Sequence, residues 1–189
     1  NKKGIAGSYN NIGNLYKEQG INDKALDNFF AALKINEEIG NKSWVANNYN
    51  NIGLIYKEQG NYDKALENYF ASLKIKEEIG NKQGMAVSYS NIGNIYYYQG
   101  NNDKALENYF VSLKINQEIG DKKGIADSYL SIGSVHKNKN NFSEAIANLQ
   151  KGLWLFKDIG AKDGVMDAYN NLAHAYEKMK SFKLAYENH

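Results

Sequence analysis

Hydrophobic and polar positions alternate along the chain with a helical period, and the whole pattern returns every 40 residues. Residues 61–82 (NYDKALENYFASLKIKEEIGNK) and 101–122 (NNDKALENYFVSLKINQEIGDK) are identical at 17 of 22 positions. In the first block, large apolar residues fall at steps of four, three and four, namely Ile5, Tyr9, Ile12 and Tyr16. This spacing is typical of the buried face of an α-helix, so the pattern predicts an all-α protein of repeated helices.

Glycine followed by a short polar residue separates the predicted helices. Such pairs stand both between and within blocks: Gly40-Asn41, Gly60-Asn61, Gly80-Asn81, Gly100-Asn101 and Gly120-Asp121. Glycine takes the left-handed conformation that ends a helix, and Asn or Asp accepts hydrogen bonds from the free amides that start the next one. We expect helices over residues 42–59 and 62–79, with the same registers one block earlier and later. Asn140 replaces the glycine in the fourth block and tolerates the same conformation.

Small and large residues alternate where paired helices should meet. The second helix of each block keeps one position small, at Ala25, Ala65, Ala105, Ala145 and Ala185, and another large, at Phe29, Tyr69 and Tyr109. Glycines also lie inside the first helices, at Gly13, Gly53 and Gly93. A glycine inside a helix costs about 1 kcal/mol relative to alanine. We therefore expect a neighbouring helix to approach closely at these glycines.

The block resembles the tetratricopeptide repeat (TPR) family. In the second block the residues that carry the resemblance are Tyr49, Ile52, Gly53, Tyr56, Ala65, Tyr69 and Ser72. The 40-residue period is similar to that of the long-helix TPRs of Pins-type spindle-orientation adaptors, kinesin light chains and bacterial sensor and regulator proteins. Two features depart from the family pattern. The proline that usually ends a unit is missing, and the fourth block has His136 and Asn140 where the preceding blocks have Tyr and Gly.

The resemblance implies a right-handed superhelical solenoid of stacked antiparallel helix hairpins. We expect a single domain over 1–189, with repeats at about 1–40, 41–80, 81–120 and 121–160 and a partial repeat at 161–189. A single hairpin cannot bury both of its faces, so the units must stack on their neighbours. Because the chain opens on Asn1 and stops inside a unit, we expect a fragment of a longer protein. Its C-terminal end, being poorly covered, is a candidate for self-association.

In the resembled family, the helix face opposite the apolar stripe lines a concave groove that binds peptides. The candidate binding residues on this face are Asn10, Asn14, Lys17, Asn47, Asn50, Leu54, Lys57, Val87, Asn94, Tyr97, Leu130, Asn170 and His174. Asparagine is a mediocre helix former, so its repeated placement here requires another role. Its amide can pair with both the C=O and the N–H of an extended peptide. The alternative explanation is a compositional bias toward asparagine, with hydrogen bonds along the helix surface.

A second set of asparagines lies to one side of this face, where the side chains can bond to neighbouring helices; its members are Asn11, Asn51, Asn91 and Asn171. Four apolar residues interrupt the polar face itself: Leu54, Val87, Tyr97 and Leu130. Exposed apolar residues that gather together mark contact sites. We expect them to seat an apolar side chain of an extended or helical peptide whose backbone is held by Asn50 and Asn94. Lysines at one end (Lys3, Lys17, Lys57) and acidic residues at the other (Asp127, Asp163, Asp167, Glu177) would orient it.

Composition and charge point to a protein or peptide partner. The net charge of +2, without a basic run, argues against nucleic acid. No stretch approaches the roughly 18 apolar residues of a membrane span. The chain has no cysteine, and its three histidines offer neither a catalytic group nor a metal site: His136 replaces a packing tyrosine, and His174 with Glu177 supplies too few ligands. We expect no enzyme, metal or cofactor, and a cytoplasmic location.

Two functions remain open at this point. The first is an interaction module that binds a peptide segment of a partner in its groove. The second is a sensory or regulatory domain of a larger bacterial signalling protein, which would act by intramolecular contact or self-association. An adjoining kinase, cyclase or DNA-binding domain would favour the second function.

Overall fold

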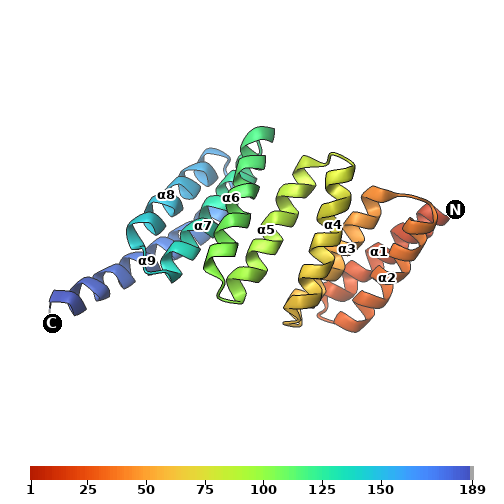
Figure 1. The fold of residues 1–189 in the computed structure, drawn as a ribbon, viewed down its shortest axis with the longest axis horizontal. Helices are drawn as coiled ribbons and strands as arrows, with labels where there is room; N and C mark the ends of the chain where they lie inside the picture. The colour runs from red at the N-terminus through yellow and green to blue at the C-terminus, as the bar shows by residue number, and fades with distance from the viewer. Residues whose placement is uncertain (188–189) are drawn as a thin grey trace. The chain divides into compact units, whose positions relative to one another are not determined.

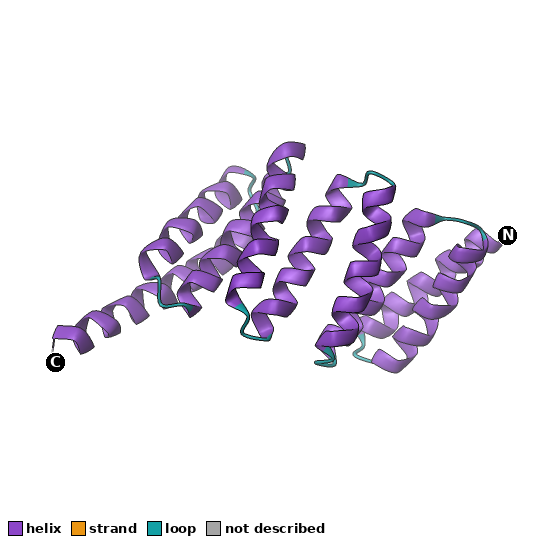
Figure 2. Ribbon diagram, viewed as in Figure 1, coloured by secondary structure: helices purple, strands orange, loops and turns teal. Residues whose placement is uncertain are grey.

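Residues 1–187 are described by the computed structural model, with side chains up to Lys180, and every regular element in that range is an α-helix (Figures 1 and 2). The helices are α1 (Lys2–Glu18), α2 (Asn22–Glu38), α3 (Lys42–Glu58), α4 (Tyr62–Glu78), α5 (Lys82–Tyr98), α6 (Asn102–Ile119), α7 (Lys122–Asn138), α8 (Phe142–Asp158) and α9 (Lys162–Glu187). The predicted helices over 42–59 and 62–79 are confirmed to within one residue at each end. The all-α prediction is confirmed for the described residues.

The helix ends form as the glycine pattern predicts. Gly60, between α3 and α4, has a φ of +73°, and Asn140, between α7 and α8, takes the same left-handed conformation with a φ of +60°. Asn61 accepts a hydrogen bond from the backbone N–H of Lys64 at 3.3 Å, as a helix-capping residue should. Asn41 is an exception, because its side chain makes no capping hydrogen bond.

The fifth block follows a different course from the others. Its helix α9 continues from Lys162 to Glu187 without a turn at the position where the earlier blocks bend back. Lys180 stands there in place of the left-handed glycine or asparagine, so the local signal for a turn is missing. The side chain of Ala185, predicted as the small residue of a second helix, lies outside the described side chains.

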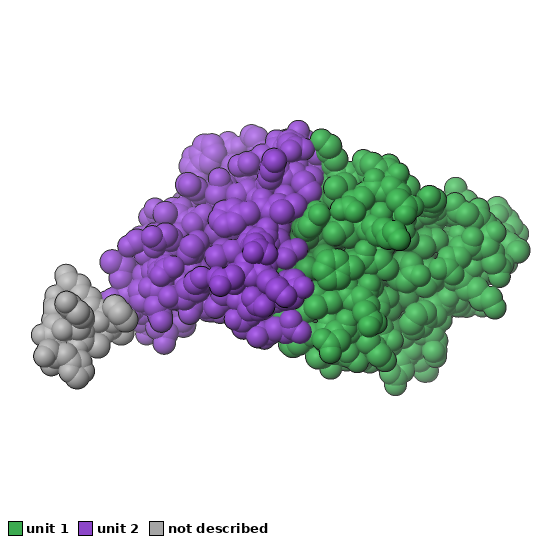
Figure 3. All heavy atoms as spheres, in the orientation of Figure 1, with its two compact units in different colours: residues 1–95 green, residues 96–189 purple. Residues whose placement is uncertain are grey.

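The chain divides into two compact units, residues 1–95 and residues 96–189, which are coloured separately in Figure 3. The boundary falls inside α5. Within unit 1, each of α1, α2 and α3 packs against the next helix in the chain. Within unit 2, α6, α7, α8 and α9 pack in the same order, and α7 also contacts α9. Each unit is therefore a stack of helix hairpins.

The glycines inside α1 and α3 allow close packing of the first two hairpins, as predicted. A Cβ atom added to Gly53 would lie 2.8 Å from Cε1 of Tyr69 and 3.3 Å from the backbone oxygen of Ala65. Tyr69 and Ala65 are fully buried. Gly13 meets the ring of Phe29 in the same way. The small and large positions therefore interlock across the hairpin.

The apolar stripe that we predicted to be buried is exposed on α1, whereas the equivalent stripe of the second block is buried on α3. Ile52 is fully buried, whereas Ile5, Tyr9 and Ile12 on α1 are all exposed, with Ile5 at 49%. The reason is that α1 has a packed hairpin neighbour, α2, on one side only among the described residues, so the other side of its stripe stays open. The same positions on α3 are covered by helices on both sides.

Buried polar side chains join successive hairpins. Within unit 1, Asn48 donates to Oδ1 of Asn10 at 2.7 Å and accepts from Nδ2 of Asn36 at 2.9 Å, which links α1, α2 and α3. One block later, Lys76 and Ser88 form the equivalent buried pair. Nζ of Lys76 donates to Oγ of Ser88 at 3.0 Å. Buried polar groups must be paired, so these bonds hold the register between hairpins. Part of the asparagine content is therefore structural.

Candidate functional site

A pocket of about 270 Å³ opens between α1 and α3 in unit 1. Six asparagines and one tryptophan line it: Asn10, Asn11, Asn14, Trp44, Asn47, Asn50 and Asn51. Four of them, Asn10, Asn14, Asn47 and Asn50, are among the candidate residues chosen from the sequence. We call this site the asparagine pocket. No charged side chain lines it, so its recognition chemistry is that of amides beside one large aromatic ring.

Two of these asparagines already have hydrogen-bond partners within the fold. Asn10 is 4% exposed; its Nδ2 donates to the backbone oxygen of Ala6 at 3.2 Å, and its Oδ1 accepts from Asn48. Oδ1 of Asn50 accepts from Nδ2 of Asn91 at 2.9 Å. These bonds fix both side chains, so they form a rigid base of the pocket.

The other predicted asparagines of the pocket keep their amides open. Asn47 is exposed and Asn14 is half-buried, and among the described residues neither side chain makes a hydrogen bond. An open amide offers one acceptor and two donors. Asn14 and Asn47 are therefore two groups of the pocket with free capacity for a ligand.

Trp44 was missed by the sequence analysis, although the sequence carries a signal for it. The same position of the other blocks is glycine in every case, at Gly4, Gly84, Gly124 and Gly164. Trp44 is 42% exposed and forms one wall of the asparagine pocket. A comparison of the blocks at this position would have identified Trp44, because the second block alone departs from glycine there.

The remaining candidates in unit 1 lie outside the lining of this pocket. Lys17, Lys57, Leu54 and Asn94 are half-buried, and Val87 is exposed. Asn94 has an interaction of its own in the structure. Asn91 on α5 donates to Asn50 on α3, so it bonds to a neighbouring helix as the sequence predicts.

In unit 2, two candidates that we expected to be open are partly packed into the core. Leu130 is half-buried against Leu149, Leu172 and Ala175, and Gly152 provides the space for it. Tyr97 is half-buried against the cluster around Tyr109. Both side chains lose accessible area in this way. Asn170 and His174 on α9 are exposed.

Asp127 on α7 lies close enough to Asp167 on α9 for the two carboxylates of unit 2 to affect one another. Loss of hydration raises the pKa of the Asp127 carboxyl, and the nearby Asp121 and Asp167 raise it further, against the opposing effect of Lys123. Lys137, on the same helix, donates to Oδ1 of Asn171 at 2.9 Å, and burial lowers its pKa.

The described part of the chain shows neither a metal-binding cluster nor a membrane-spanning helix. No group of three or more His, Asp or Glu side chains there is arranged to hold a metal ion. None of the described helices is both long and apolar enough to cross a membrane.

Family profiles match most of the sequence. The profile described as tetratricopeptide repeat matches residues 4–78 and 84–158, and a second profile with the same description matches residues 167–188. A comparison with curated proteins finds no match.

Solved structures with the same fold come from several proteins. BtubC (BKLC) from P. vanneervenii is 25% identical, with a TM-score of 0.76 over 85% of this chain and 66% of that one. Aspartyl phosphate phosphatase F from Bacillus subtilis is 14% identical, with a TM-score of 0.87 over 100% and 51%. A signal transduction ATPase with numerous domains (STAND) and a tetratricopeptide repeat sensor, from Pyrococcus horikoshii, is 20% identical, with a TM-score of 0.83 over 93% and 28%. The chain thus spans less than two thirds of each of these proteins.

Proposed function

Because this chain belongs to the tetratricopeptide repeat family, we propose that it is a protein–protein interaction module that binds a peptide segment of a partner in the asparagine pocket. The observation that carries this proposal is the lining of that pocket, in which open amides stand beside an exposed tryptophan. No catalytic step is part of the proposed function.

The open amides suit a peptide backbone. Asn14 and Asn47 each offer donors and an acceptor, so they can pair with the N–H and C=O groups of an extended segment irrespective of its side chains. Asn10 and Asn50 are held in place by the fold, which lowers the entropy cost of ordering the site on binding. Trp44 would contact an apolar side chain of the same segment. The pocket therefore grips the backbone and selects for one apolar residue.

The other candidates extend this proposal beyond the pocket. Leu54 and Val87 would contact apolar residues of the ligand within unit 1, and Tyr97 and Leu130 would do so within unit 2. Lys17 and Lys57 would attract acidic residues of the ligand. Asn94, Asn170 and His174 would add polar contacts.

Removing the open amides or the tryptophan is expected to weaken peptide binding. An arrayed peptide library, followed by titration of an enriched peptide, would be compared between the wild type and the variants Asn47→Ala, Asn14→Ala and Trp44→Ala. We expect about fivefold weaker binding for each asparagine variant, since each loses one hydrogen bond. We expect about tenfold weaker binding for Trp44→Ala. Alanine is the better helix former, so the asparagine variants should keep their stability.

Asn68→Ala on α4 is the matched control, because its Nδ2 donates to the backbone oxygen of Lys64 at 2.8 Å, away from the pocket. It should bind as the wild type does. Equal binding by all four variants and the wild type would refute the asparagine pocket as the peptide site.

A second candidate function is a sensory or regulatory domain of a larger signalling protein. The observation that favours it is the match to the STAND protein, in which repeats of this fold are described as a sensor. The match covers 28% of the length of that protein. The likeness at 20% identity concerns the fold. A kinase, cyclase or DNA-binding domain in the adjoining gene sequence would support it, and its absence would count against it.

Self-association would be the simplest mode of action for such a domain. On α9, four large apolar side chains are exposed, at Met166, Tyr169, Tyr176 and Met179. Light scattering should then show a mass that rises with protein concentration, and Met166→Lys should abolish the rise. A monomeric mass at all concentrations would exclude this contact.

A further inference from the structure

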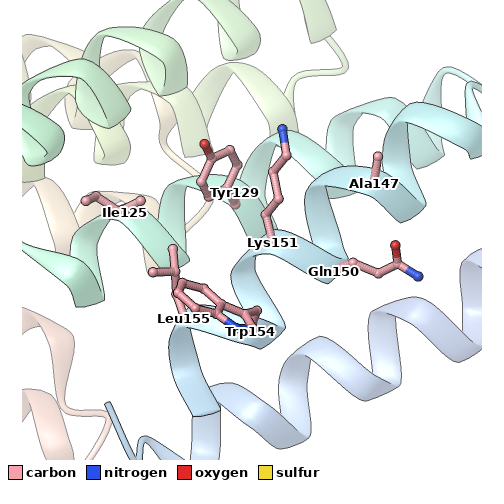
Figure 4. A pocket seen from close by; sticks show the side chains of 7 residues that line it. All are labelled: Ile125, Tyr129, Ala147, Gln150, Lys151, Trp154 and Leu155. Carbon is pink, nitrogen blue, oxygen red and sulfur yellow. The ribbon is translucent and has the colours of Figure 1, made fainter. Parts of the chain in front are cut away.

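A second and larger pocket lies within unit 2, between α7 and α8. Its volume is about 640 Å³, and its lining residues are Ile125, Tyr129, Ala147, Gln150, Lys151, Trp154 and Leu155. Figure 4 shows Ile125 and Tyr129 extending from α7, with the other five side chains coming from α8. None of these residues belongs to the asparagine pocket or to the candidates found from the sequence.

The fourth repeat differs from the first three at four of the seven positions that line this pocket. Ala147 replaces Asp27, Glu67 and Glu107; Gln150 replaces Phe30, Phe70 and Phe110; Lys151 replaces Ala31, Ala71 and Val111; and Trp154 replaces Lys34, Lys74 and Lys114. Compared with the first three repeats, the fourth repeat lacks the acidic residue and the phenylalanine at these positions, and it carries a lysine and a tryptophan where they have other residues. The chemistry of this lining is therefore particular to the fourth repeat.

Trp154 supplies an apolar contact surface. It is 65% exposed, more than any other large hydrophobic side chain of the described residues. Leu155 lies beside it, and Ile125 lines the same pocket from α7 (Figure 4). A rigid ring next to aliphatic side chains buries much area on binding at little cost in side-chain entropy. The pocket can therefore accept a large apolar side chain.

Lys151 adds a positive charge to the pocket wall. Its Nζ lies 5.4 Å from the centre of the Tyr129 ring, which holds it by a cation–π contact. No carboxylate lines the pocket, and Asp158, one turn beyond Trp154, is already paired with Lys122 at 2.7 Å. Glu144, at the start of α8, lies outside the lining. Among the described residues, Lys151 is thus the only charged side chain that lines this pocket.

We propose that this pocket is a second binding site, for a partner peptide in which a large apolar residue adjoins an Asp or Glu. The apolar side chain packs against Trp154, and the carboxylate pairs with Nζ of Lys151. Gln150 closes one edge, where its Nε2 donates to the hydroxyl of Tyr176 at 3.2 Å. This site is separate from the asparagine pocket and depends on none of its residues.

Three variants test the site. Trp154→Lys and Lys151→Ala restore residues that earlier repeats carry at these positions, so both should fold, as circular dichroism would verify; Lys151→Arg keeps the charge. An arrayed peptide library would be screened with the wild type, and enriched peptides with an apolar–acidic pair would then be titrated. We expect about tenfold weaker binding for Trp154→Lys. We expect about fivefold weaker and less salt-dependent binding for Lys151→Ala, and binding within about twofold of the wild type for Lys151→Arg.

Lys74→Ala is the charge-matched control, since it removes an exposed lysine of α4 outside the pocket. It and Trp44→Ala should leave this binding unchanged, which separates it from that of the asparagine pocket. The proposal is overturned if the library enriches no apolar–acidic pair. It is equally overturned if Trp154→Lys binds like the wild type, or if Lys74→Ala weakens binding as much as Lys151→Ala does.

Discussion

Replacing Gly53 by leucine is expected to destabilise the protein by about 3 kcal/mol, because the added atoms would overfill a packed hairpin. The first added atom alone would lie 2.8 Å from the Tyr69 ring and 3.3 Å from the backbone oxygen of Ala65. The ring is fully buried and the oxygen belongs to the helix backbone, so neither can move away without separating α3 from α4. Since each repeat is stabilised by its neighbours, unfolding should also become less cooperative.

Urea unfolding followed by circular dichroism would measure this effect. Gly7→Leu is the matched control: Gly7 lies inside α1, and a Cβ atom there would have no neighbour within 4 Å. That variant should keep the wild-type stability or gain up to about 1 kcal/mol, because leucine is the better helix former. Similar losses in the two variants would show that the cost comes from placing leucine within a helix and not from the packing of α3 on α4.

The second large effect is expected from pH, through the buried Lys76. This side chain is 3% exposed, and burial lowers its pKa from 10.5 to about 8. Between these two values the unfolded chain holds a proton that the folded chain has released, so the free energy of unfolding rises with pH. From about pH 7 to about pH 9.5 the contribution of Lys76 should grow by about 2 kcal/mol.

Lys76→Asn isolates this contribution, because asparagine occupies the equivalent buried positions Asn36 and Asn116. The wild type and the variant share every tyrosine and the other lysines, so the difference between their stabilities cancels the titration of those groups. We expect the variant to be the more stable protein near neutral pH and to lose that advantage as the pH rises. A difference that stays constant with pH would mean that Lys76 is not charged differently in the two states.

The helices and their ends could be predicted from the sequence because they depend on local chemistry. The turns at Gly60 and Asn140 need only a residue that accepts a left-handed conformation. The close approach at Gly53 was likewise readable, since an interior glycine is costly unless a neighbour requires it. The signal for the tryptophan wall of the asparagine pocket was also present, in the glycines at the equivalent positions of the other repeats.

What the sequence could not predict is which polar side chains serve the fold and which remain open. Asn10 and Asn47 look alike as members of one helical face, yet Asn10 is bonded to Asn48 inside unit 1 while Asn47 is exposed. Leu130 was expected on the open face but packs against α8 and α9. In each case the outcome depends on contacts between residues far apart in the chain.

The sequence by itself determined the repeat, its helical hairpins and the family, because these follow from spacing, glycine positions and the matching of small to large residues. The tertiary structure alone decided the roles of the asparagines, the burial of Lys76 and the pocket beside Trp154. The physical reason is that the helical period predicts only which face of its helix a side chain lies on. Hydrogen bonding and burial depend instead on which atoms of neighbouring helices lie within a few ångströms of that side chain.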